Sequence, residues 1–105
     1  MNKVKINNLE YTIEEVDEIG KSDDGGTYNG QIDYIDQKIL ILKRLSKEQK
    51  KNTLRHELTH AFLWAYGFYQ MESLNYETVC DFVGIYSEQI VKIANEYMKK
   101  IKEEV

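Results

Sequence analysis

The chain has 105 residues, of which 42% are hydrophobic and 30% are charged, a composition that predicts a single folded domain spanning residues 1–105. Its net charge of -4 argues against a nucleic-acid-binding protein, because such proteins normally carry a surplus of basic residues. Its single cysteine excludes both an internal disulfide framework and a zinc site built from cysteines.

The sequence carries no visible targeting or membrane segment. Residues 1–10 contain no apolar stretch long enough for the core of a signal peptide. The longest run of consecutive apolar residues, Ile39–Leu42, is far too short to cross a bilayer. Together with the lone Cys80, these features predict a cytoplasmic protein that does not contact a membrane.

The N-terminal part of the chain predicts two short strands followed by a turn. Apolar and polar residues alternate in two segments, as they do in half-buried strands. The run Ser-Asp-Asp-Gly-Gly at residues 22–26 is the strongest turn signal in the sequence. The alternating apolar residues are Val4 and Ile6 in the first segment and Tyr11, Ile13 and Val16 in the second.

A hairpin is expected next. Its first strand is Gly30–Ile35, where polar and apolar residues alternate, and its turn is Asp36–Gln37. Its second strand, Lys38–Lys43, is apolar at successive positions, so both of its faces should be covered.

From Ser46 the apolar residues recur with the period of a helix. Ser46 and Gln49 have the spacing of a capping box, in which the two side chains satisfy free backbone N–H groups at a helix start. Gly67 predicts the end of this helix. A second helix is expected to start near Asn75 and to run close to the C-terminus. The whole chain therefore predicts an α+β fold, with a small twisted sheet followed by two helices.

The first predicted helix contains His56-Glu57-Leu58-Thr59-His60, an H-E-x-x-H motif that uses both histidines of the chain. Residues four apart lie on one helix face, so the two imidazoles can reach one zinc ion (Zn2+). Glu57 is then placed to take a proton from a water on that ion, as a general base. Because both histidines point away from the apolar stripe of the helix, they can face a cleft, although solvated surface histidines would show the same pattern.

A hydrolytic zinc site needs three protein ligands and one open position. Since there is no third histidine, the remaining ligand is expected to be a carboxylate. Glu77 is the first candidate, and Asp81 and Glu72 are the alternatives. Asp81 lies one turn after Glu77 and could instead orient a ligand imidazole.

The surroundings of these carboxylates allow two interpretations. Residues 79–86 are nearly all apolar and Asp81 is their only charge, which predicts burial, with Gly84 allowing close approach of a neighbouring helix. On the other hand, Glu77 and Asp81 lie in line with Glu88 and Lys92 on the solvated face of the later turns.

The pattern His56-Glu57-x-x-His60 followed by Glu77-x-x-x-Asp81 resembles the gluzincin branch of the zinc metallopeptidases. More closely, the chain is similar to small phage and mobile-element proteins related to the ImmA/IrrE family. The similarity covers roughly residues 30–86. Its further segments are Gly30-x-Ile-Asp-Tyr34, Ile39-x-Ile41 and Leu45-Ser46.

The resemblance implies a minimal zincin fold, in which a helix after the motif helix supplies the third ligand. It implies a zinc ion on His56, His60 and Glu77, with Glu57 as the general base. The implied reaction is hydrolysis of a peptide bond in a protein or peptide substrate. An interaction domain that binds zinc but is proteolytically silent is the alternative, and the intact Glu57 argues against it.

Two departures from the family pattern limit what the resemblance implies. The interval between His60 and Glu77 is shorter than in many relatives, and no C-terminal subdomain completes a substrate cleft, so general proteolysis is not expected. With both histidines used, a tyrosine would have to stabilise the oxyanion. The candidates are Tyr34, Tyr66, Tyr69 and Tyr76. The sequence does not indicate an oligomeric state.

Overall fold

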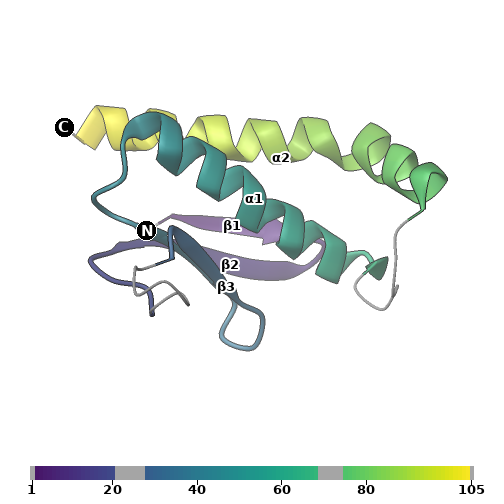
Figure 1. Cartoon of the computed structure of the whole chain (residues 1–105), viewed down its shortest axis with the longest axis horizontal. Helices are drawn as coiled ribbons and strands as arrows, with labels where there is room; N and C mark the ends of the chain where they lie inside the picture. The colour runs from purple at the N-terminus through teal and green to yellow at the C-terminus, as the bar shows by residue number, and fades with distance from the viewer. Residues whose placement is uncertain (1, 21–27, 69–74, 105) are drawn as a thin grey trace.

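The computed structural model describes residues 2–20, 28–68 and 75–104, and it shows a sheet followed by two helices (Figure 1). This order confirms the predicted α+β architecture, with the long helix at the C-terminal end. The predicted turn at residues 22–26 lies outside the described residues. The elements are β1 (Lys3–Ile6), β2 (Leu9–Val16), β3 (Gly30–Asp33), β4 (Lys38–Leu42), α1 (Lys47–Ala65) and α2 (Tyr76–Glu104).

The strands form one sheet in the order β1-β2-β4-β3, so β1 and β3 are its edge strands. β1 and β2 form a hairpin through Asn7 and Asn8, whose φ angles of 46° and 71° lie in the left-handed region that asparagine tolerates. β3 and β4 form the predicted hairpin, in which Ile32 pairs with Ile39, but β3 ends at Asp33 and residues 34–37 form the turn, so the predicted strand to Ile35 is two residues too long. The hairpins are joined through β2 and β4, which run parallel with Ile13 opposite Ile39.

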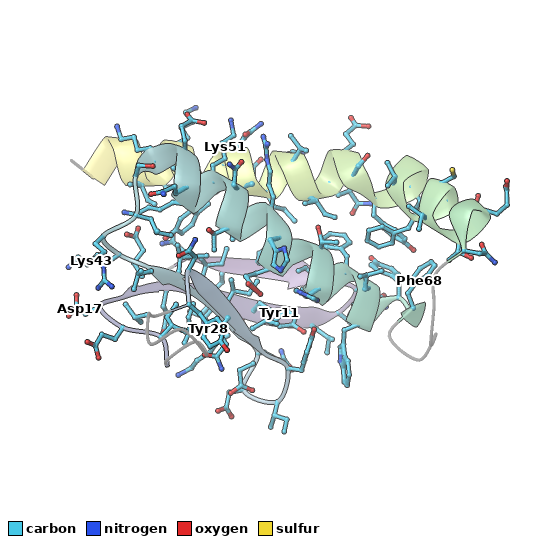
Figure 2. All side chains as sticks on the ribbon, in the orientation of Figure 1. Tyr11, Asp17, Tyr28, Lys43, Lys51 and Phe68 are labelled. Atoms are coloured by element: carbon cyan, nitrogen blue, oxygen red, sulfur yellow. The ribbon has the colours of Figure 1, made fainter. Side chains whose placement is uncertain are left out.

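The core lies between the sheet and the helices (Figure 1). Tyr11, labelled in Figure 2, and Ile39 are fully buried there. On the other face of β4, Leu42 is buried but Leu40 is only half-buried. Both faces of this strand were predicted to be covered, and the face away from the core is covered only in part. The buried core residues are Ile6, Tyr11, Ile13, Ile39, Ile41, Leu54, Leu58, Ala61, Phe62, Phe82, Ile90, Ala94 and Tyr97.

Local sequence signals set the helix boundaries. At the start of α1, the Ser46 hydroxyl accepts a hydrogen bond from the Gln49 amide, and the Gln49 side chain accepts one from Ser46 N, so the predicted capping box is present. Beyond the end of α1, Gly67 adopts a left-handed φ of 86°, as the predicted stop requires. At the start of α2, the Asn75 side chain accepts a hydrogen bond from Thr78 N, which makes Asn75 the N-cap.

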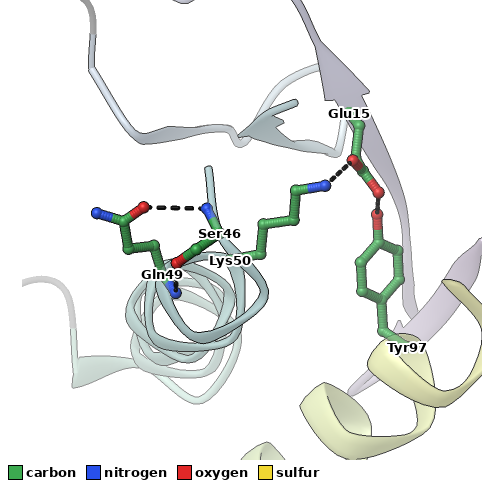
Figure 3. A network of polar contacts seen from close by, with 5 residues as sticks. All are labelled: Glu15, Ser46, Gln49, Lys50 and Tyr97. Carbon is green, nitrogen blue, oxygen red and sulfur yellow. Dashed lines mark hydrogen bonds and ion pairs between the residues drawn. The ribbon is translucent and has the colours of Figure 1, made fainter. Parts of the chain in front are cut away.

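Glu15 fixes the two helices relative to the sheet (Figure 3). One oxygen of this β2 carboxylate accepts a hydrogen bond from Lys50 Nζ of α1 at 2.7 Å, and the other accepts one from the Tyr97 hydroxyl of α2 at 3.0 Å. Because both the Lys50 and the Glu15 side chains are largely shielded from solvent, this ion pair is screened less than a fully exposed one. Through Glu15, the N-terminal part of α1 and the C-terminal half of α2 are both linked to β2.

The apolar stretch at residues 79–86 is more exposed than its composition predicts. Asp81 is exposed, and no atom outside the adjacent backbone of α2 lies within 4 Å of a Cβ built on Gly84, so the predicted burial of Asp81 and the close helix approach at Gly84 are wrong. Only one side of α2 is covered here: the rings of Phe82 and Tyr86 contact Phe68 and Tyr66, whereas the next residues around the helix face away from them. Phe82 is buried there, whereas Val79, Val83 and Ile85 are exposed. Neither helix, over the described part of the chain, is long and apolar enough to cross a membrane.

Candidate metal centre

His56 and His60 lie one turn apart on the exposed side of α1, as the motif predicts. The burial of Leu54, Leu58 and Ala61 on the other side of the helix fixes this orientation. The two Nε2 atoms are 3.3 Å apart, and the rings meet edge to face at 77°. In the absence of a metal, this distance also allows one ring to donate a hydrogen bond to the other. The two nitrogens therefore converge on one point in front of the helix.

Glu57 stands between the histidines in sequence but on the inner side of the helix. It is 6% exposed and is the one charged residue buried among those the structure describes. Burial raises the pKa of the Glu57 carboxyl, and the neighbouring His56 and His60 lower it by a smaller amount. Hence a buried carboxylate sits beside two exposed ring nitrogens.

The ligand atoms of His56, Glu57 and His60 all lie within 4.8 Å of one another, and no other such group occurs in the described ranges. Zinc binds imidazole nitrogen at about 2.0–2.1 Å in tetrahedral geometry, which places two ligand nitrogens about 3.3–3.4 Å apart. The observed separation of 3.3 Å between the Nε2 atoms matches that value. The donor set therefore fits a zinc ion, with two nitrogens in place.

β3 forms the wall of the cleft in front of this group. The cleft has a volume of about 550 Å³, and Gly30, Gln31 and Ile32 line it together with the three motif residues. Tyr28, labelled in Figure 2, is half-exposed at the same cleft. The motif side chains thus face the edge strand of the sheet.

Tyr34 is the one predicted tyrosine that the described structure brings to the cleft. Burial raises the pKa of the Tyr34 hydroxyl, and the charge on Glu57 raises it further, which indicates that the two groups are close. Tyr66 instead packs its ring on Tyr86, with centroids 4.5 Å apart. Nothing is described for the side chains of Tyr69 and Tyr76.

The predicted carboxylate ligands of the second helix are not part of this group. Glu77 lies in the first turn of α2, and both Glu77 and Asp81 are exposed. Neither belongs to the cluster of His56, Glu57 and His60. Glu72 lies outside the described residues. The assignment of Glu77 as a ligand stays a prediction.

Gly30 is a site residue that the sequence did not single out for this purpose. A Cβ built on it would lie 2.5 Å from Thr53 Cγ2 and 3.2 Å from Glu57 Oε2. Since such distances are too short for unstrained contacts, only glycine lets β3 approach α1 this closely. The strand–helix packing that forms the cleft depends on it.

Replacing Gly30 by alanine is expected to lower the free energy of unfolding by about 1–3 kcal/mol, the usual cost of overpacking. Removing the opposing methyl with Thr53→Ser should recover part of that loss, because the 2.5 Å contact is to Thr53 Cγ2. Urea unfolding of the two single variants and the double variant measures this coupling. Strictly additive effects would show that the close approach does not exist.

No protein-family model matches the chain, and neither the curated proteins nor the solved structures searched contain a match to it. The resemblance to the ImmA/IrrE family therefore stays a prediction that rests on the motif.

Proposed function

We propose that this chain is a zinc-dependent peptidase, in which His56 and His60 hold the metal and Glu57 is the general base. The observation that carries the proposal is the 3.3 Å separation of the two Nε2 atoms beside the buried carboxylate of Glu57. A hydrogen bond between the two rings would also bring these nitrogens together, so it is the buried carboxylate of Glu57 beside them that favours a metal site. The order of a sheet, a motif helix and a second helix supports a minimal zincin-like fold.

The chemical role of each group in the site follows from its position. A zinc ion on the two histidines would supply Lewis acidity toward a substrate carbonyl and toward a coordinated water. Glu57 accepts the proton of the attacking water at its carboxylate and passes it to the leaving amine. Its burial keeps that carboxylate in an environment with little competing solvent. The Tyr34 hydroxyl, at the same cleft, is suited to donate a hydrogen bond to the oxyanion.

β3 provides the means to hold an extended peptide. It is an edge strand of the sheet, and it pairs with β4 on its inner side. An extended peptide can add to such an edge through main-chain hydrogen bonds. Because Gly30, Gln31 and Ile32 line the cleft with the motif residues, a peptide on this edge would pass in front of His56 and Glu57.

Two carboxylates could complete the ligand set. Glu57 already lies within 4.8 Å of both histidines, whereas Glu77 would have to be brought to them from the start of α2. The proposal keeps Glu77 as the third ligand, because a general base must remain available for protons. The two assignments predict different zinc affinities for the Glu57 and Glu77 variants.

Removal of the metal tests the proposed activity. The purified chain should bind about one zinc ion and should cleave some members of a mixture of unstructured peptides. A chelator should lower the rate at least 100-fold, and zinc should restore it. Cleavage that is insensitive to the chelator would contradict the proposal. Zinc binding without cleavage would favour the silent interaction domain instead.

A further inference from the structure

A second hollow opens beside the metal cleft and shares Gln31, Ile32 and Tyr34 with it. We call it the Trp64 pocket; it has a volume of about 390 Å³. The residues that line it are Gln31, Ile32, Asp33, Tyr34, Ile35 and Trp64. It therefore continues the metal cleft along β3 and into the turn that follows.

The floor of the Trp64 pocket is aromatic. The rings of Tyr34 and Trp64 stack with centroids 4.5 Å apart and planes inclined by 23°. Trp64 nevertheless keeps 37% of its surface exposed. A stacked pair of this kind presents a broad, preformed apolar surface that loses little side-chain entropy when a ligand covers it.

The rim of the pocket is an ordered turn that holds an apolar side chain in solvent. Ile35 is 92% exposed. The turn is fixed because Asp33 Oδ1 accepts hydrogen bonds from the backbone N–H groups of Ile35 and Asp36, both at 3.0 Å. Both bonds are to Oδ1 of the one acidic side chain of the pocket, and its other lining side chains are an amide, aliphatic groups and aromatic rings. Its remaining surface suits an apolar group rather than a cation.

The distance along α1 sets the position of this pocket relative to the site. Trp64 follows His60 by one turn, about 6 Å along the helix. Two residues of an extended peptide span about 6.6 Å. Consider a peptide held on β3 with its scissile bond at the histidines. The side chain that lies one or two residues from that bond would then sit over the Trp64 pocket.

We propose that the Trp64 pocket binds a large apolar side chain, aliphatic or aromatic, of a peptide substrate, one or two residues from the scissile bond. That the bound peptide is a substrate rests on the proposed peptidase function, whereas the binding of an apolar peptide does not depend on it. A competing apolar groove of about 300 Å³ between α1 and α2 includes Leu63 and Val83. That groove shares none of its residues with the metal cleft, so it serves as the control surface.

Peptide binding to the full-length Glu57→Gln variant, with and without zinc, tests the inference. The probes are fluorescein-labelled peptides Ala-Ala-X-Ala-Ala, in which X is Leu, Phe, Ala or Asp. The Leu and Phe peptides should bind at least tenfold more tightly than the Ala peptide by fluorescence polarisation. Because Trp64 is the single tryptophan of the chain, unlabelled Leu and Phe peptides should also change its fluorescence.

Variants assign the preference to one surface. Trp64→Ala and Ile35→Ser should each reduce the affinity for the Leu and Phe peptides toward that for the Ala peptide, and Val83→Ser should leave all affinities unchanged. Ile35 is so exposed that its replacement does not threaten folding. Equal affinities for the four peptides, undetectable binding of all of them, or a preference that depends on Val83 would overturn the inference.

The outcomes separate this inference from the proposed function. Apolar preference that depends on Trp64, combined with no cleavage by the zinc-loaded wild type, would refute the peptidase and keep the pocket. Zinc-dependent cleavage with no preference for the residue at X would keep the peptidase and refute the pocket.

Discussion

Replacing His60 by alanine is expected to abolish the zinc-induced stabilisation of this chain while leaving the metal-free protein nearly as stable as the wild type. A ligand present at 100 times its Kd stabilises the state that binds it by about 2.7 kcal/mol. For a domain of this size that corresponds to a rise in Tm of about 10–20 °C. His60 is exposed, so its loss alone should change the free energy of unfolding by no more than about 0.5 kcal/mol.

Thermal unfolding with and without zinc measures this difference, and isothermal titration gives the Kd directly. His56→Ala should behave like His60→Ala, because the two rings contribute equivalent Nε2 atoms. Asn52→Ala is the matched control: Asn52 is also exposed on α1, one turn before His56, and should keep the full zinc response. A zinc-induced rise in Tm that survives both histidine substitutions would exclude this site.

The same titration decides between the two carboxylates. If Glu77 is the third ligand, Glu77→Ala should weaken zinc binding strongly, although Glu77 is exposed and outside the observed group. An unchanged Kd would instead exclude Glu77 and leave Glu57, Asp81 and Glu72 as the carboxylates to test in the same way. In that case the sequence-based choice of Glu77 would be wrong.

Features coded within a few residues were predictable. The capping box of Ser46 and Gln49 and the stop at Gly67 set the limits of α1, because their hydrogen bonds and backbone angles are local. The placement of His56 and His60 on one side of the helix follows from the helical period. The sequence thus contained the part of the candidate site that a single helix can build.

Features that join distant segments were not predictable. The parallel pairing of β2 with β4, which places β3 at the edge beside α1, has no signature in either strand. The same packing brings Gly30 and Tyr34 to the motif. In the sequence, Gly30 marked the start of a strand and Tyr34 was one of four candidate tyrosines, and the family resemblance that includes both residues did not say that they reach the motif. For residues 79–86, apolar composition predicted burial, but only the side of α2 that carries Phe82 and Tyr86 packs on the core, and which side packs is decided by distant segments.

Glu57→Gln is the substitution expected to affect activity most selectively. Glutamine has nearly the same shape as glutamate, but its amide cannot accept the proton of the attacking water. Loss of a general base typically costs a factor of about 100–10,000 in rate. The variant should therefore retain zinc with a Kd within about threefold of the wild type, while peptide cleavage falls at least 100-fold.

The combination of these two readouts is what distinguishes a base from a ligand at this position. Glu57 lies within 4.8 Å of both ring nitrogens, close enough for its carboxylate to serve in either role. A ligand role predicts that zinc affinity and cleavage fall together in Glu57→Gln, because the weaker donor affects the metal itself. A base role predicts that only cleavage falls. Glu77→Gln, measured alongside, should show the opposite pattern if Glu77 holds the metal. Its zinc affinity should fall more than that of Glu57→Gln, and its cleavage rate at saturating zinc should fall less.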